Sequence, residues 1–201
     1  MLNYAVLAVI VCSAAASDFT PRSAVAYLSN GDIQGNITFR QINEKQVAVE
    51  GSILGLAPGK YGFHVHEKGD LRGGCASAGS HFNPHGKEHG GPTATERHVG
   101  DLGNVEFDAN HIARIDYIDD QISLYGLHNI LGRSVVLHQG QDDLGLGKHP
   151  DSLTTGNAGG RAACAIIGVL DPVTPWSGAT TASVSIVAFI ASSIFALLIS
   201  H

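Results

Sequence analysis

Between Asp18 and Asp171 the chain repeats short runs in which apolar and polar residues alternate, with little helical periodicity. A period of two is typical of β-strands that have one face in a core. The runs are separated by Gly, Asn, Asp and Pro, and the 25 glycines suit many tight turns. This pattern predicts an all-β fold, an antiparallel sandwich or barrel. The predicted strands are SAVAYL (23–28), GNITFRQI (35–42), KQVAVEGSI (45–53), YGFHVHE (61–67), GNVEFD (103–108), HIARIDYI (111–118), QISLYG (121–126), SVVLH (134–138) and CAIIGVL (164–170).

Two long segments, residues 68–104 and 139–161, lack any strand pattern and are rich in glycine and polar residues. Loops of this length inside a compact domain are usually functional or disordered. Both segments adjoin histidines, which favours a functional role for each.

All 12 Lys and Arg and all 18 Asp and Glu fall between Asp18 and Asp171, so the net charge of −6 belongs to the middle of the chain. No basic run or patch appears there, and the composition argues against nucleic-acid binding. The first end has an apolar run from Ala5 to Cys12 followed by small residues, which predicts a signal peptide over residues 1–17. An uncleaved N-terminal anchor is the alternative, although about eight apolar residues are too few to span a bilayer.

The other end is a hydrophobic tail, residues 183–201, preceded by a linker or spacer, residues 173–182. Small residues at 177–179, a short polar spacer and a terminal apolar tail fit the attachment signal of a GPI lipid anchor. A retained transmembrane helix is the alternative. Either reading leaves one domain, residues 18–172, outside the cell and held by its tail at the outer face of the plasma membrane.

An extracellular location sets the chemistry of two further features. Cys12 leaves with the signal peptide, and an oxidising compartment lets the remaining Cys75 and Cys164 pair. Closing so long a loop contributes about 4–5 kcal/mol in the chain-entropy model, and two separate buried thiols are the alternative. The sequon at Asn36 faces outward if Ile37 and Phe39 face the core, which makes Asn36 a candidate for N-glycosylation.

Several of the 11 histidines are spaced as metal ligands. His64 and His66 share one face of a predicted strand, and SVVLH places His138 at the end of another. The first long loop carries three histidines and an aspartate with the spacing H-x7-H-x8-H-x2-D: His81, His89, His98 and Asp101. Three imidazoles and a carboxylate form a four-coordinate set of the kind zinc takes. Imidazole sets without a thiolate suit copper or zinc.

At these residues the chain resembles the Cu/Zn superoxide dismutase family, extracellular type. GFHVHEKGD, GSHFNP with KEHGGP after it, ERHVGDLGN and GNAGGRAAC match that family's motifs, and the likeness covers about residues 22–171. The resemblance implies an eight-stranded Greek-key sandwich or barrel with two long functional loops. It implies an oxidoreductase that converts superoxide to dioxygen and hydrogen peroxide by Cu(II)/Cu(I) cycling, with one copper and one structural zinc per subunit. It also implies a homodimer, for which NILG (129–132) and AIIGV (165–169) are the apolar candidates.

The resemblance also implies a role for each matched residue. Arg161 would guide the anion beside copper, and Asp142 would orient one copper histidine and one zinc histidine. His81 would bridge both metals and donate a proton, and Cys75 and Cys164 would form the intrachain disulfide. The implied copper ligands are His64, His66, His81 and His138; the implied zinc ligands are His81, His89, His98 and Asp101.

Not every expectation follows the family pattern. Gly140 and Thr154 stand where relatives often have lysines, so we expect weaker attraction of superoxide and a shallower loss of rate with salt. Two other classes of function are alternatives, a surface protein that sequesters metal without turnover and an adhesion module that uses the fold alone. The unmatched histidines are interpreted as scattered, outside the metal sites: His85, His111, His128, His149 and His201.

Overall fold

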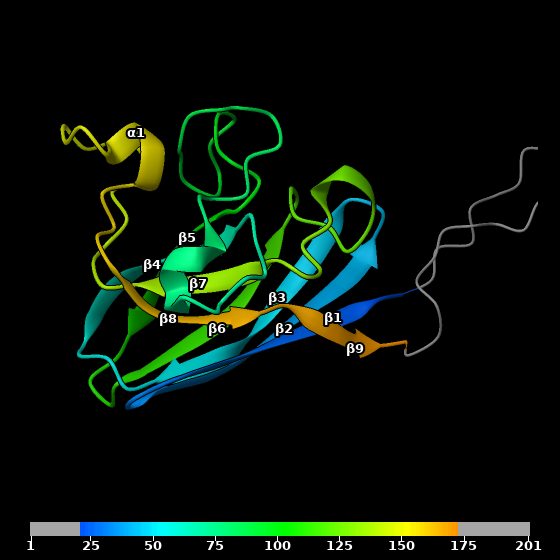
Figure 1. The fold of residues 1–201 in the computed structure, drawn as a ribbon, viewed down its shortest axis with the longest axis horizontal. Helices are drawn as coiled ribbons and strands as arrows, with labels where there is room; N and C mark the ends of the chain where they lie inside the picture. The colour runs from blue at the N-terminus through cyan, green and yellow to red at the C-terminus, as the bar shows by residue number, and fades with distance from the viewer. Residues whose placement is uncertain (1–20, 173–201) are drawn as a thin grey trace, which may run out of the picture.

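The computed structural model describes residues 21–172, and nine strands within that range form one antiparallel sheet (Figure 1). The strand order is β8-β7-β4-β5-β6-β3-β2-β1-β9. β1 also runs beside β8, where Asn30 Nδ2 donates to Ala162 O at 2.7 Å, so the sheet nearly closes into a barrel. The strands are β1 (Ser23–Asn30), β2 (Ile33–Asn43), β3 (Gln46–Leu54), β4 (Gly59–His66), β5 (Asp101–Phe107), β6 (Ile112–Asp119), β7 (Ser134–His138), β8 (Arg161–Ile166) and β9 (Gly168–Asp171).

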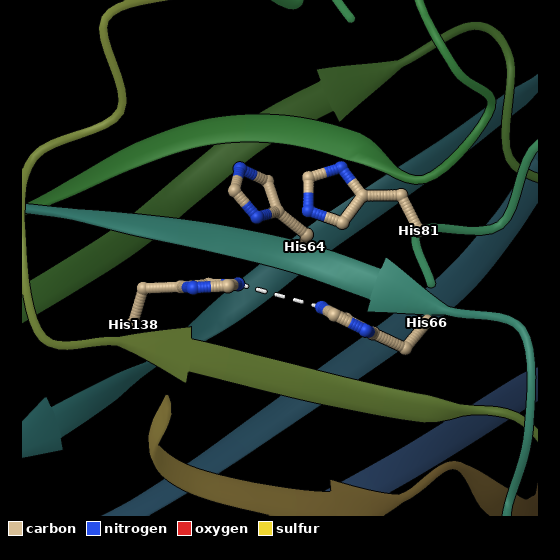
Figure 2. Close-up of side chains that lie close together, drawn as sticks. All are labelled: His64, His66, His81 and His138. Atoms are coloured by element: carbon tan, nitrogen blue, oxygen red, sulfur yellow. Dashed lines mark hydrogen bonds between the residues drawn. The ribbon is translucent and has the colours of Figure 1, made fainter. Parts of the chain in front are cut away.

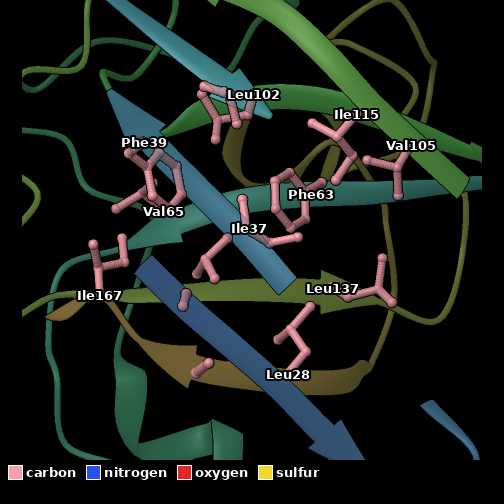
Figure 3. Packing of buried hydrophobic residues seen from close by; sticks show 14 of the residues in the cluster. Leu28, Ile37, Phe39, Phe63, Val65, Leu102, Val105, Ile115, Leu137 and Ile167 are labelled. Atoms are coloured by element: carbon pink, nitrogen blue, oxygen red, sulfur yellow. The ribbon is translucent and has the colours of Figure 1, made fainter. Parts of the chain in front are cut away.

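The core fills the inside of this barrel with the apolar residues of the alternating runs (Figure 3). In β2, Ile37 and Phe39 are fully buried, while Asn36 before Ile37 is exposed and Thr38 between them is partly exposed, as the alternation predicts. Each large apolar side chain buried in this way stabilises the fold by about 1.5–3 kcal/mol. The predicted all-β class is confirmed. The barrel formed by residues 21–172 is the scaffold that holds the loops.

The predicted strand QISLYG is wrong, since residues 121–126 form an irregular segment that leads into a short 3-10 helix, η2 (Gly126–His128). Ile122 and Leu124 are buried, which produces the strand-like alternation. Their backbone N–H groups are satisfied by side chains instead of a neighbouring strand. Asp119 Oδ1 accepts from Ile122 N at 2.9 Å, and Gln41 Oε1 accepts from Leu124 N at 2.7 Å.

The predicted strand CAIIGVL is divided in two; with QISLYG removed, the other eight predicted strands therefore become nine, one more than the eight that the resemblance implies. The chain breaks at Ile167, whose N–H donates to Arg133 O and whose carbonyl accepts from Gly132 N, both at 2.9 Å. β8 before the break pairs with β7, and β9 after it pairs with β1.

Two long loops stand at one end of the sheet, residues 67–100 with η1 (Gly74–Ala78) and residues 139–160 with α1 (Ser152–Thr155) (Figure 1). A disulfide joins Cys75 in η1 to Cys164 in β8, with a Cα–Cα distance of 5.6 Å. The first loop is thereby tied to the barrel wall. The predicted signal peptide, spacer and tail lie outside the described residues. Within residues 21–172, no helix has the length and apolar character needed to cross a membrane.

Candidate metal centre

His64 and His66 lie on β4, a strand that is buried on both faces along its second half. Phe63 and Val65 point into the apolar core, so the histidines point together to the opposite face, as the period of two predicts. Gly62 makes room for them. A Cβ at that position would lie 2.8 Å from Ala158 Cβ and 3.1 Å from His64 Cε1.

Two more imidazoles reach the same face from different elements (Figure 2). His138 ends β7, which pairs with β4 beside His64. His81 comes from the first long loop, whose backbone joins the sheet in an antiparallel bridge to His66. Phe82 N donates to Val65 O at 2.8 Å, so the loop is held to β4 by its own backbone at the point where His81 is needed.

One ring nitrogen of each of these four histidines offers a ligand atom, and all four atoms lie within 4.8 Å of one another. His66 Nδ1–H donates to Gly79 O at 2.9 Å and His138 Nδ1–H to Gly159 O at 3.2 Å, which leaves both Nε2 atoms available, 3.4 Å apart. His64 is reversed: its Nε2–H donates to Asp142 Oδ2 at 2.8 Å, and its buried Nδ1 has no hydrogen-bond partner. His81 Nε2 is also buried without a partner.

A second set gathers around the carboxylate of Asp101 at the start of β5. Oδ1 lies 2.8 Å from His81 Nδ1 and 3.1 Å from His98 Nδ1, and Oδ2 lies 3.0 Å from His89 Nδ1. His89 Nδ1 makes no hydrogen bond despite that distance. Three imidazole nitrogens gathered around one carboxylate, two of them hydrogen-bonded to it, form the ligand set that one ion requires. His81 therefore belongs to both sets, one through each ring nitrogen.

Asp142, which the resemblance implies as the carboxylate behind both sets, hydrogen-bonds one histidine of each set. Oδ2 accepts from His64 and Oδ1 from His89, each at 2.8 Å. Asn104 holds the backbone of Asp142 through two hydrogen bonds of 2.8 and 2.9 Å. Gly156, at φ +66°, leaves space for the carboxylate, because a Cβ there would lie 1.9 Å from Asp142 Oδ1. The sequence predictions missed both Asn104 and Gly156.

Burial keeps the first set of imidazoles neutral, which is the form that binds a metal ion. Burial, with His81 nearby, lowers the pKa of His64 to about 3 and that of His66 to about 2. Burial likewise lowers the pKa of His138 to about 4. These side chains therefore present lone pairs throughout the physiological pH range.

The second set carries negative charge. Burial opposes ionisation of Asp101 and Asp142, but hydrogen bonds from histidines outweigh it, lowering the pKa of Asp101 far below its usual range and that of Asp142 to about 2. For His89, burial alone would lower the pKa, but the nearby carboxylates of Asp101 and Asp142 outweigh burial and raise it to about 9. A dication bound here would lie next to the ionised carboxylate of Asp101, with the ionised carboxylate of Asp142 behind the imidazoles.

A pocket of about 470 Å³ opens from the four-histidine set to the surface, and Arg161 lies in its wall. The Arg161 guanidinium donates to the carbonyls of Cys75, Ala76 and Gly79, which fix it in place. The wall also contains Thr154 and Asp151, with no lysine among its residues. Arg161 therefore lies in the same pocket wall as His66, His81 and His138, and its role toward an anion stays a prediction.

Sequence inspection also missed a buried ion pair that supports the second set. Arg97 is fully buried, with Nη2 at 2.6 Å from Asp119 Oδ2 and Nη1 at 2.9 Å from Asp101 O. Arg97 thereby joins the loop that carries His98 to the end of β6. An arginine between a glutamate and a histidine gives no signal of burial in the sequence.

The residues present fit copper and zinc. Four neutral imidazoles with convergent nitrogens suit copper, and three imidazoles with an ionised carboxylate suit zinc. The three buried histidine nitrogens that lack hydrogen bonds, in His64, His81 and His89, all belong to these sets. A polar atom buried without a partner is costly, and a bound ion removes that cost.

Comparisons with known proteins agree with this chemistry. The sequence profile of the family described as copper/zinc superoxide dismutase (SODC) matches residues 33–167. The chain is 48% identical over 180 residues to an extracellular superoxide dismutase [Cu-Zn] of Drosophila melanogaster, covering 84% of this chain and 99% of that one. It is 51% identical over 149 residues to the protein of the same name from Brugia pahangi, covering 73% and 74% of the two chains.

Among solved structures, a crystal structure of the clock protein EA4 superposes with a TM-score of 0.74 at 62% sequence identity. The match covers 78% of this chain and 99% of that one. The chain belongs to the copper/zinc superoxide dismutase family, a family of oxidoreductases that use copper and zinc.

Proposed function

We propose that this chain converts superoxide to dioxygen and hydrogen peroxide outside the cell, with one copper and one zinc held in the two histidine sets. The observation that carries the proposal is the shared imidazole of His81. Its Nδ1 faces the Asp101 carboxylate, and its buried Nε2 is left to the four-imidazole set. A single side chain that serves two sets couples the two ions chemically, which storage of either ion alone does not need.

In this proposal His64, His66, His81 and His138 hold copper, and His81, His89, His98 and Asp101 hold zinc. When bound, copper supplies the one-electron chemistry by cycling between Cu(II) and Cu(I), and zinc supplies fixed positive charge. The protein supplies position, protons and electrostatics.

His81 is the group that holds a proton for peroxide formation. Its Nε2 is buried and faces the pocket side, while its Nδ1 is fixed on the Asp101 side. Burial lowers the pKa of His81, so a proton on Nε2 is readily given up. Peroxide needs two protons, and His81 is placed to deliver one of them.

Asp142 and Arg161 position the other participants. Asp142 fixes the ring orientation of His64 and His89 at once, and carboxylates behind metal-bound histidines tune affinity and ring basicity. Arg161 is the one Lys or Arg among the described residues in the wall of the 470 Å³ pocket and attracts superoxide locally, although the chain carries a net charge of −6.

Two other functions predict different behaviour. A metal-sequestering protein would bind both ions without turnover, and it would have no use for an arginine fixed in the pocket wall. An adhesion module would need neither the buried imidazoles nor the pocket. Measured turnover separates both alternatives from the dismutase.

The test is to express residues 18–177, load copper and zinc, and follow superoxide loss by direct absorbance decay. We expect fast catalysis that disappears in His138→Ala and is unchanged in His111→Asn, an exposed histidine whose Nδ1 contacts Leu56 O. No catalysis in protein that holds both metals would overturn the dismutase proposal and leave sequestration as the leading function.

We also propose that the enzyme is attached to the outer face of the plasma membrane by a GPI lipid, which replaces the hydrophobic C-terminal tail when the tail is cleaved off. The extracellular names of the Drosophila and Brugia relatives support the outside location. A phospholipase specific for phosphatidylinositol should release active enzyme from intact cells expressing the full chain. Activity that stays with the cells after this treatment would favour a transmembrane tail instead.

We propose that the enzyme is a homodimer and a glycoprotein. Ile166, Val169 and Leu170 are about half exposed beside the NILG segment and offer an apolar surface for a second copy. Sedimentation of the expressed protein should give twice the mass of one chain.

Asn36 is exposed on β2, and Asn36→Gln should remove the mass that a glycosidase removes from the secreted protein. An unchanged mass would exclude a glycan there.

A further inference from the structure

Two histidines outside the metal centre also bring their ring nitrogens together. His85, in the first long loop, and His128, at the end of η2, have their Nε2 atoms 2.6 Å apart. Their rings meet edge to face, with centroids 4.9 Å apart and an interplanar angle of 76°. His85 is exposed and His128 is partly exposed, so an ion can reach the pair from solvent.

The tautomer of His128 is fixed in the form a metal requires. Its Nδ1–H donates to Gln121 O at 2.7 Å, so its Nε2 carries a lone pair directed away from the protein backbone. His85 Nδ1 makes no hydrogen bond within residues 21–172, and it can take the ring proton when Nε2 is needed as a ligand. Binding a metal ion therefore needs a change of tautomer at His85 and no change of net charge.

The backbone holds both histidines in place. Asn83 spans the turn around His85, accepting from Lys87 N at 3.0 Å and donating to Lys87 O at 2.8 Å. The carbonyl of His128 accepts from Ser123 N at 3.0 Å, which ties η2 to the segment before it. Ligands whose backbone is already ordered lose less entropy when an ion binds.

The metal centre itself provides the comparison for the geometry. The pairs His66–His138 and His81–His98, which belong to the two ligand sets, have ring nitrogens 3.4 Å apart. Ligand nitrogens about 2.0–2.1 Å from one ion stand roughly 2.9–3.4 Å apart for angles between right and tetrahedral. The His85–His128 pair reaches that spacing by a small rotation of the exposed His85 ring.

We propose that His85 and His128 form a third metal site, which takes Cu²⁺ or Zn²⁺ with water as the remaining ligands. Imidazole suits both ions, and the order of affinities for divalent metals makes Cu²⁺ the more tightly bound of the two ions. With two protein ligands and exposure to solvent, the site binds more weakly than the buried sets.

The position of the site gives it a consequence for the metal centre. His85 lies between His81 and His89 in the chain, and both of these belong to the Asp101 set. An ion held by His85 and His128 cross-links that loop to η2. The cross-link slows any opening of the loop that would let the buried zinc escape.

The test uses Cu²⁺ as the probe on enzyme whose buried sites are already loaded with copper and zinc, as checked by metal analysis. We expect calorimetric titration to detect one further Cu²⁺ per subunit, with an electron paramagnetic resonance signal distinct from that of the buried copper. His85→Gln and His128→Gln should each weaken this binding by at least about tenfold, since each removes one of two ligands.

His111→Asn is the matched control. His111 is exposed and its Nδ1 also contacts a backbone carbonyl, but among residues 21–172 no hydrogen bond or ring contact joins it to a second imidazole. Binding that stays unchanged in this variant, with superoxide activity retained in every variant, supports the site. The proposal is overturned if the loaded enzyme takes up no further Cu²⁺, or if uptake persists in the double variant of His85 and His128. Neither outcome depends on turnover, so this test stands apart from that of the proposed function.

Discussion

The two halves of the metal centre are built from the same residue type and differ in the charge around it. In the copper half, burial holds the pKa of His64, His66 and His138 at about 3, 2 and 4. In the zinc half, two ionised carboxylates outweigh burial and raise the pKa of His89 to about 9. In the proposed function, the ionised carboxylates of the zinc half favour a dication, whereas the copper half remains neutral and opens to the pocket, where an ion that changes charge would meet an anion.

The largest expected effect comes from removing one ligand from each half in turn. His138→Ala should abolish catalysis while zinc stays bound, because only the copper half loses an imidazole. His98→Ala should release zinc while copper and part of the activity remain. Metal analysis of both variants beside superoxide decay tests this. Loss of both metals in either variant would show that the halves do not hold their ions separately.

The next effect concerns the buried support of the zinc half. Arg97→Met should lower the free energy of unfolding by about 3–5 kcal/mol, since Asp119 is left as a buried charge without its partner. Urea denaturation of the metal-loaded protein measures the change. Arg40→Met is the control, because its ion pair with Glu50 is exposed and should change stability by less than about 1 kcal/mol.

Asp142→Asn tests whether the carboxylate that joins His64 to His89 supports both metal sites. An amide cannot accept from both His64 and His89 as a carboxylate does, so the affinity for both metals should fall by about 10–100-fold. Competition with a chelator measures each metal separately. Asp143→Asn is the neighbouring control, and a loss confined to one metal would contradict a shared role for Asp142.

A smaller effect is expected at the pocket wall. Arg161→Ala should lower the rate by about tenfold at low salt by removing local attraction of the anion. The wild-type rate should decline gently with salt, because no lysine of residues 21–172 lines the pocket. Rates measured from low to high ionic strength test both statements. A steep salt dependence in wild type would mean that charges beyond the pocket wall attract the substrate.

The smallest effect is the opposite response of the two halves to pH in metal-free protein. Histidines with lowered pKa bind protons more readily when unfolded, so their contribution to stability falls as pH drops below about 6.5. His89 has a raised pKa, so the stability it adds is complete below about 6.5 and is lost as pH rises towards about 9. Urea midpoints should therefore decrease towards acid, and His89→Gln should remove the decrease towards alkali. Midpoints that rise towards acid in wild type would contradict this balance.

Much of this arrangement could be predicted from the sequence because its signals are local. The alternation around His64 and His66 gives their common face, and the loop spacing gives the Asp101 set. The missed features depend on contacts between distant segments. Gln41 and Asp119 satisfy the backbone that was expected to be a strand, and Asn104 holds Asp142 across the barrel end. No periodicity encodes such side-chain-to-backbone bonds.

The disulfide makes the geometry of the site depend on the redox state of the compartment that holds the chain. The Cys75 segment supplies carbonyls that hold Arg161, and Gly79 O just beyond it also accepts from the copper-side His66. Cys164 fastens this segment to β8. A chain still in a reducing environment lacks that fastening, so its anion guide and one copper imidazole are not yet fixed. If the chain is exported as proposed, we therefore expect full activity, and the peroxide that comes with it, only after the disulfide has formed outside the reducing interior of the cell.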